Sequence, residues 1–104
     1  MSASGTATLD FGAFPGKGDT SVAVTGQTGI LAGSLIGAWI RPVATSDHTA
    51  DEHMVESLKV IAGNIVAGTG FTIYGFEEGT MPHTAQPSTA HLLYGTWTIA
   101  WAWT

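Results

Sequence analysis

The sequence contains no cysteine and few charged residues. Its 104 residues include three Lys or Arg and eight Asp or Glu, and charged residues make up 11% of the chain. An ordinary soluble domain has about 25%. Without Cys the chain has neither a disulfide framework nor a thiolate metal site, so packing, strand pairing and oligomerisation must stabilise it. A surface of Thr, Ser, Gly and Ala indicates a subunit partly covered by other subunits, with a Thr- and Ser-rich extracellular β protein as the alternative.

Charge and hydropathy also exclude several partners. A formal net charge of -5 argues against nucleic acid, because binding a phosphate backbone requires clustered Lys and Arg. No segment approaches the roughly 20 apolar residues of a membrane span, so we expect no membrane insertion. Residues 1–5 carry neither the basic nor the apolar region of a secretory signal. We therefore expect synthesis in a cytoplasm without cleavable export.

The clearest pattern in the chain lies at its C-terminal end, where large apolar residues alternate with small ones. Trp97, Ile99, Trp101 and Trp103 fall on one face of a strand, because strand side chains alternate with period two. A buried Trp removes about 150–250 Å² of surface from water. We predict that this face forms much of the core.

Six segments are predicted as strands, each bounded by Gly, Pro, Asp or Ser. They cover residues 6–11, 20–25, 34–43, 57–66, 70–77 and 91–104. Apolar residues on both faces of 34–43 predict that both faces are covered. Gly68 and Gly70 flank Thr69 and predict an antiparallel hairpin. Because no long helix is indicated, we predict an all-β fold, a compact six-stranded antiparallel β-sandwich that forms a single domain over residues 1–104.

Residues 44–56 form the longest polar segment, in which Ser46 or Asp47 is predicted to cap one or two helical turns. The segment offers two imidazoles and several carboxylates. A divalent metal would use His48, Asp51 or Glu52, and His53, but their spacing fits no established metal template. We favour a solvated loop in which Asp caps a turn and His bonds a backbone carbonyl, with no metal or cofactor. The candidate residues in this polar loop are Asp47, His48, Asp51 and His53.

Catalytic patterns are weak throughout the chain. There is no Cys nucleophile and no Gly-x-Ser-x-Gly turn, and the Gly-rich segments lack the residues of a phosphate-binding loop. Glu77 or Glu78 with Asp51 or Glu52 is the one carboxylate combination to consider for glycoside hydrolysis. Glu77 and Glu78 face opposite sides of a strand, so they are not such a pair themselves. We predict that the protein is not an enzyme, because a sandwich of this size leaves little room for a substrate pocket.

Exposed aromatic residues are the better candidates for binding partners. We expect Phe14, Trp39, Tyr74 and Tyr94 to be accessible, and we single out Phe14, in a Pro- and Gly-rich loop, as an anchor for a neighbouring subunit. The alternative is that Phe14 folds back and covers the end of the sandwich. Residues 78–88 contain two Pro and predict a long exposed loop. The predicted partner-binding residues are Phe14, Trp39, Tyr74, Met81 and His83.

The chain as a whole resembles small virion proteins of tailed bacteriophages. The resemblance rests on the six strands, the polar Asp-His loop, Gly-Thr-Gly-Phe-Thr-Ile at 68–73 and Gly-Thr-Trp-Thr-Ile-Ala-Trp at 95–101. The strand count and the last two segments are also similar to the H-type lectin fold, a six-stranded sandwich that forms trimers and recurs in phage appendages. This similarity implies a homotrimer, but no ligand contact of the lectin family matches a residue here.

Two roles in a virion follow from the resemblance. A head decoration protein would bind the major capsid protein and stabilise the capsid, whereas a tail or head-fibre tip would bind a glycan on the host surface. The chain shows no fibrous shaft and no coiled-coil heptad, which favours decoration. The expected location is the virion, after synthesis in the host cytoplasm. A free-standing lectin with the same fold is a third possibility.

Overall fold

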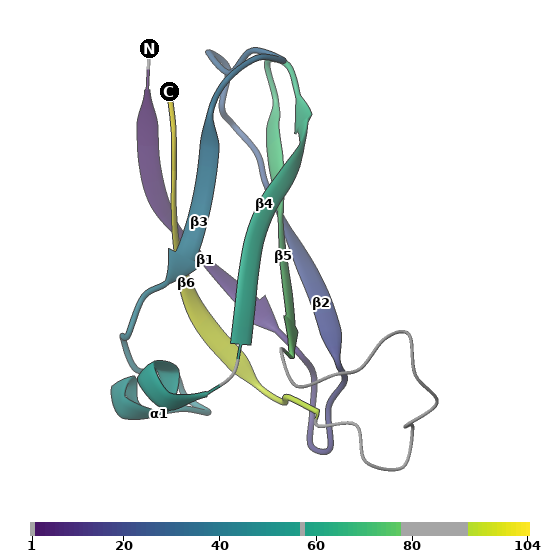
Figure 1. Cartoon of the computed structure of the whole chain (residues 1–104), viewed down its shortest axis with the longest axis vertical. Helices are drawn as coiled ribbons and strands as arrows, with labels where there is room; N and C mark the ends of the chain where they lie inside the picture. The colour runs from purple at the N-terminus through teal and green to yellow at the C-terminus, as the bar shows by residue number, and fades with distance from the viewer. Residues whose placement is uncertain (1, 57, 78–91) are drawn as a thin grey trace.

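The computed structural model describes residues 2–56, 58–77 and 92–104, which form six strands and one short helix (Figure 1). In chain order the elements are β1 (Ala3–Asp10), β2 (Asp19–Val24), β3 (Ile36–Ile40), α1 (Ala50–Val55), β4 (Leu58–Val66), β5 (Gly70–Glu77) and β6 (Thr96–Trp103). The predicted all-β fold is confirmed. No helix in these residues is long and apolar enough to cross a membrane.

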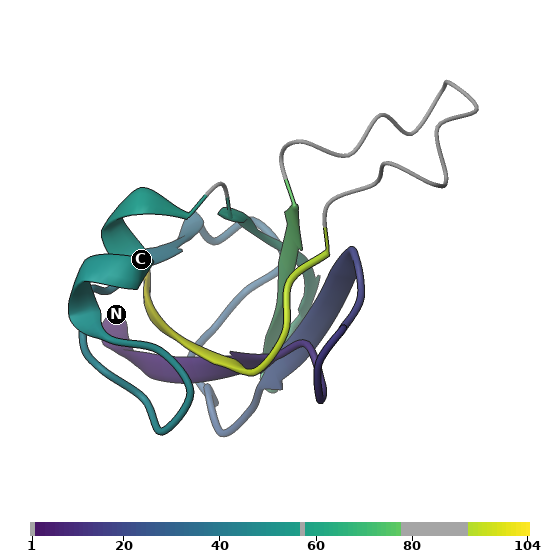
Figure 2. The same ribbon diagram turned by 90° about the horizontal axis from the view of Figure 1, so that it is seen from below.

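The strands form two three-stranded antiparallel sheets, in the orders β1-β6-β3 and β2-β5-β4. The first and last strands pair along their whole length, from Ala3 opposite Trp103 to Asp10 opposite Thr96. β3 lies against β4, and β1 lies against β2. Viewed from below, the two sheets therefore curve around a common interior, with α1 at one side (Figure 2).

The core lies between the central strands β6 and β5. Trp97, Ile99, Trp101 and Trp103 are all buried, so the predicted core face of the last strand is confirmed. Their partners from the other sheet include Phe71 and Ile73 of β5. Gly75 of β5 has a packing role, because a Cβ atom at this position would collide with the side chain of Leu9 from the opposite sheet.

The starts of two strands, β1 and β6, differ from the prediction. β1 begins at Ala3 rather than at residue 6, because residues 3–5 pair with the end of β6. β6 begins at Thr96 rather than at residue 91, and Leu93 forms an isolated bridge with Lys17 instead.

The prediction that both faces of the third strand are covered is wrong. β3 spans only Ile36–Ile40, and Trp39 on its outer face is exposed. The inner residues Ile36, Ala38 and Ile40 pack against the core. β3 is an edge strand in a two-layer fold, so only one of its faces meets the other sheet.

The predicted turn and helix are both present. β4 and β5 form an antiparallel hairpin, in which Gly68 has the positive φ of 76° that a tight turn requires. α1 is a six-residue helix, but Thr49 caps it rather than Ser46 or Asp47. The Thr49 hydroxyl accepts from the Glu52 amide, and the Glu52 carboxylate accepts from the Thr49 amide, so both hydrogen bonds of a capping box are present.

Candidate functional site

The exposed aromatic residues lie on separate parts of the surface. Phe14, in the loop between β1 and β2, is 77% exposed, and Trp39 on β3 is 51% exposed. Tyr74 lies on the outer face of β5, in the other sheet. The predicted exposure of these three residues is confirmed, but Trp39 and Tyr74 do not share a surface. The other two predicted partner residues, Met81 and His83, lie outside the described residues, as does the predicted loop 78–88.

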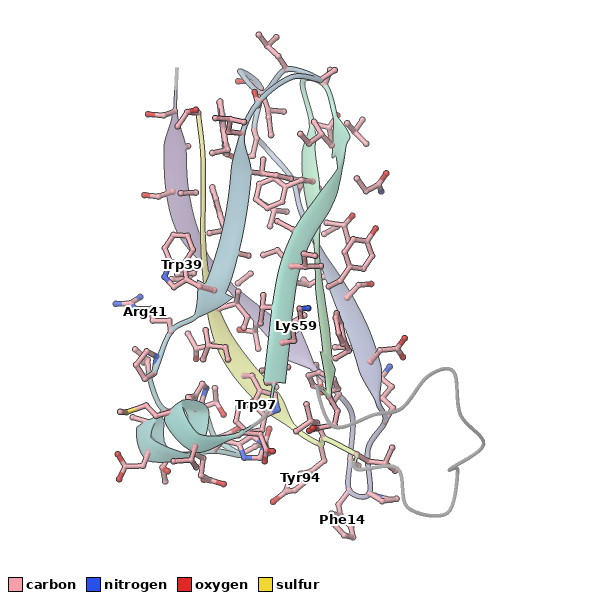
Figure 3. The ribbon with its side chains drawn as sticks, in the orientation of Figure 1. Phe14, Trp39, Arg41, Lys59, Tyr94 and Trp97 are labelled. Atoms are coloured by element: carbon pink, nitrogen blue, oxygen red, sulfur yellow. The ribbon has the colours of Figure 1, made fainter. Side chains whose placement is uncertain are left out.

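A shallow groove of about 280 Å³ lies beside Trp39. Trp39 and Arg41 project on the same side of β3, away from β4 (Figure 3). Hydroxyl groups of Ser4 and Thr6 on β1 border the groove across the surface of β6. We call this feature the Trp39 groove. It combines an aromatic face, a guanidinium and hydroxyl groups, which is the chemistry that binds sugars and other polar planar ligands.

Asp47 fastens the polar loop to the start of β6. Its carboxylate accepts from the backbone amide of Thr96 at 2.9 Å and from the Thr96 hydroxyl at 2.8 Å. These bonds stabilise the ionised form, so the pKa of Asp47 is lowered below its ordinary value. Asp51, in the first turn of α1, is exposed. The bonds to Thr96 give Asp47 a structural role, and it is not the helix cap, for which we predicted Ser46 or Asp47.

His48 is buried and stacks on Trp97, with ring centroids 3.7 Å apart. Its Nε2 donates to the carbonyl oxygen of Tyr94 at 2.6 Å, and its Nδ1 lies 3.2 Å from Glu52 Oε2. Both nitrogens thus face oxygen acceptors. The pKa of Glu52 is lowered, first by the bond from the Thr49 amide and next by the bond with His48.

His53 is also buried, but its two nitrogens have different kinds of partner, one acceptor and one donor. Its Nδ1 donates to the Thr49 carbonyl at 2.7 Å, and its Nε2 accepts from the backbone amide of Thr98 at 3.0 Å. This arrangement requires a neutral ring with its proton on Nδ1. His53 thereby joins α1 to the middle of β6.

The two histidines bond backbone carbonyls, as predicted for residues 44–56, but the predicted solvated loop is wrong for them because both rings are buried. In the described ranges, no three His, Asp or Glu side chains come together in an arrangement that would hold a metal ion.

The histidines belong to a row of aromatic rings at the lower end of the molecule. Tyr94 contacts the Phe14 ring edge-on at 5.4 Å and the His48 ring at 4.9 Å. Trp97 then lies between His48 and the edge of His53. We call these five residues the ring cluster. It unites the predicted anchor Phe14 with the predicted polar loop, two features that no pattern in the sequence connects.

A pocket of about 230 Å³ opens beside the ring cluster, between α1 and the residues that precede β6. Sequence reasoning missed this pocket. One sequence signal pointed to part of its lining. Glu52 and Glu56 follow His48 at intervals of four residues, the spacing that places side chains on one face of a helix. The aromatic walls come from distant segments, which local spacing does not reveal. The lining residues are Phe14, His48, Glu52, Glu56, Leu92, Leu93, Tyr94 and Trp97.

No family model, curated protein or solved structure matches this chain. The phage and lectin resemblances therefore stay predictions, and function has to be inferred from the surfaces just described.

Proposed function

We propose that this chain is a non-enzymatic structural protein of a bacteriophage virion, a head decoration protein that binds the major capsid protein and stabilises the capsid. The proposal combines the resemblance in the sequence with one structural observation, the amount and distribution of exposed apolar surface. It includes self-association, and the similarity to H-type lectins implies a homotrimer.

The observation that carries the proposal is a set of twelve large hydrophobic side chains, counted over the described residues, that are exposed in the isolated chain. A few scattered apolar residues are normal on a monomer, but residues such as Leu35 and Val55, at 75% and 84% exposure, are costly to leave in water. The full set is Phe14, Leu31, Leu35, Trp39, Val43, Met54, Val55, Ile61, Val66, Tyr74, Leu92 and Tyr94.

The distribution of these residues favours a subunit with several neighbours. Leu35 and Trp39 lie on or beside β3 in one sheet, Ile61 and Tyr74 lie on the other sheet, and Met54 lies on α1. A receptor-binding module needs one concentrated patch. A lattice protein instead contacts copies of itself and the capsid on different sides, and the low charge of the surface suits such burial.

The first experiment is to measure the copy number of this chain in purified particles by quantitative mass spectrometry against the major capsid protein. A decoration role predicts hundreds of copies per particle, in a fixed ratio to the capsid lattice. A few to a few tens of copies would instead place the chain on a tail or fibre, and absence from the particles would refute the virion proposal.

A second experiment measures the assembly of the purified chain by sedimentation velocity. We expect a trimer, and Leu35→Ser or Ile61→Ser should shift the equilibrium towards monomer if the mutated face is an interface. Thr8→Ser serves as a control on the exposed outer face of β1, because it leaves polarity unchanged and lies outside the Trp39 groove. A monomer at all concentrations would contradict the trimer but leave capsid binding to be measured by the copy number.

The Trp39 groove favours a second candidate, a fibre tip or lectin-like module that binds host glycan. An indole face with an adjacent Arg41 and two hydroxyl-bearing residues is suited to a sugar ring. A glycan array with the wild-type chain tests this, and Trp39→Ala should abolish the signal. Tyr74→Ala is the matched aromatic control, because Tyr74 lines a different hollow with Lys17 and Ser21. Loss of binding in both variants alike would argue against the groove, and no binding across the array would retire this candidate.

A further inference from the structure

The pocket beside the ring cluster combines aromatic surfaces with negative charge. Phe14 and Tyr94 form its outer aromatic wall, and Trp97, which is 1% exposed, closes its inner end. Figure 3 shows Phe14, Tyr94 and Trp97 in succession along the lower end of the molecule. Aromatic rings attract cations through the negative potential of their faces, and quaternary ammonium groups are typical ligands of such walls.

The opposite wall of the pocket is acidic. Glu52 and Glu56 line it from α1 and its C-terminal cap. The lowered pKa of Glu52 keeps this carboxylate ionised at neutral pH. His48 lies at the same wall, with its Nδ1 3.2 Å from Glu52 Oε2.

The basic residues of the chain lie elsewhere. Lys17 lines the hollow beside Tyr74, Arg41 lines the Trp39 groove, and Lys59 lies over the Phe76 ring at 5.7 Å. None of the three is among the residues that line the pocket in the described part of the chain. Apart from His48, the ionisable residues that line the pocket within the described ranges are therefore the carboxylates of Glu52 and Glu56.

We infer that this pocket binds an alkylammonium group, held between the Phe14 and Tyr94 rings and the carboxylates of Glu52 and Glu56. A volume of about 230 Å³ is smaller than the pockets of drug-sized ligands, which span about 300–1,000 Å³, and suits one small headgroup or one side chain. The group belongs either to a free quaternary amine such as choline or to a lysine side chain of a partner protein. This inference does not rest on the proposed virion role.

The test is a titration of the full chain followed by ¹H–¹⁵N correlation NMR at constant ionic strength. The probes are choline and Nα-acetyl-lysine methylamide, which keeps its ε-ammonium group. The control is 3,3-dimethyl-1-butanol, a neutral alcohol with the shape of choline. The indole N–H of Trp97 is the reporter, because it donates to the Tyr94 carbonyl at the edge of the pocket. The indole of Trp103, which donates to Gln27, is an internal reference away from the pocket.

Two substitutions probe the two walls with side chains of similar size. Glu52→Gln removes the charge but keeps a residue that completes the capping box, and should weaken binding about three- to tenfold. Phe14→Leu keeps an apolar side chain but removes the π face, and should weaken binding about threefold. Asp51→Asn is the matched control, because it removes the same charge from an exposed position on the same helix outside the pocket. Correlation spectra of each variant establish that it is folded.

Saturable shifts of the Trp97 signal by either amine, with the neutral alcohol at least about tenfold weaker, would support the site. Tighter binding of choline would identify a free quaternary amine as the source, and tighter binding of the lysine analogue would identify a partner side chain. No saturable shift up to about 20 mM of either amine would overturn the inference. Equal binding of the neutral alcohol, or equal effects of Glu52→Gln and Asp51→Asn, would also overturn it.

Discussion

Trp97 and Trp101 occupy equivalent positions on β6 but have different neighbours. Both point inward from the same strand face, and both are buried. Trp101 packs edge-on against Phe71, with 5.6 Å between the ring centroids, and lies over Gly5 of β1. Trp97 instead lies between two histidine rings and donates a hydrogen bond to a backbone carbonyl.

This difference shows that burial and chemical environment are separate properties. Around Trp101, in the upper half of β6, the packing partners in the core are apolar. The lower half is surrounded by groups that donate and accept hydrogen bonds in a fixed pattern, and next to it lies the pocket. Substitutions that affect one half and spare the other therefore test the division directly.

The largest expected effect is that of Trp101→Ala in the apolar half. Removing a buried Trp leaves a cavity, and such changes typically cost about 3–5 kcal/mol of unfolding free energy. For a domain of this size that is a large share of the total stability. Urea unfolding measured by circular dichroism gives the cost. A cooperative variant within about 1 kcal/mol of the wild type would contradict the assignment of this face to the core.

An intermediate effect is expected for His53→Phe in the polar half. The variant keeps a ring beside Trp97 but leaves the amide of Thr98 and the carbonyl of Thr49 without their side-chain partner. An unsatisfied buried donor costs about 1–3 kcal/mol. Thermal unfolding of the variant should show a loss in this range. If stability is unchanged, the hydrogen bonds from His53 do not hold α1 to β6.

A smaller effect is expected from acidification, and it should be confined to the polar half. The pKa values of Asp47 and Glu52 are lowered from 3.8 and 4.5 in the folded chain. The unfolded chain therefore binds more protons as the pH falls. The stabilisation by these groups is complete above about pH 4.5 and is lost as the pH falls through the lowered values.

Unfolding curves between about pH 6 and pH 3 measure this dependence. The Asp47→Asn, Glu52→Gln double variant should show a shallower decline than the wild type. The control is Trp101→Phe, which should lower stability by a similar amount at every pH. Parallel curves for the wild type and the double variant would show that these carboxylates do not stabilise the fold.

The smallest effect on stability is expected for Trp39→Ala. Trp39 is half exposed on an outer face, and surface substitutions usually change stability by no more than about 0.5 kcal/mol. The same variant should change assembly or glycan binding if the Trp39 groove is functional. A loss of stability comparable to that of Trp101→Ala would mean that β3 contributes to the core through both faces.

The sequence by itself determined the strands, the hairpin and the buried face of β6. These follow from local rules, since alternation with period two assigns side chains to faces and Gly68 permits the turn. Local rules failed at β3, where apolar residues on both faces predicted coverage that an edge strand in a two-layer fold does not have. They also failed at the helix cap, because Thr49, Ser46 and Asp47 are all acceptable cap residues.

Only the tertiary structure decided what surrounds each buried residue. The ring cluster joins Phe14, the polar loop and Tyr94, which are separated by more than thirty residues at each step along the chain. The different hydrogen-bonding patterns of His48 and His53 likewise depend on distant backbone groups, the carbonyl of Tyr94 and the amide of Thr98. Periodicity records which way a side chain points, but contacts between distant segments depend on strand order and loop paths, and these decide where a pocket and its charges lie.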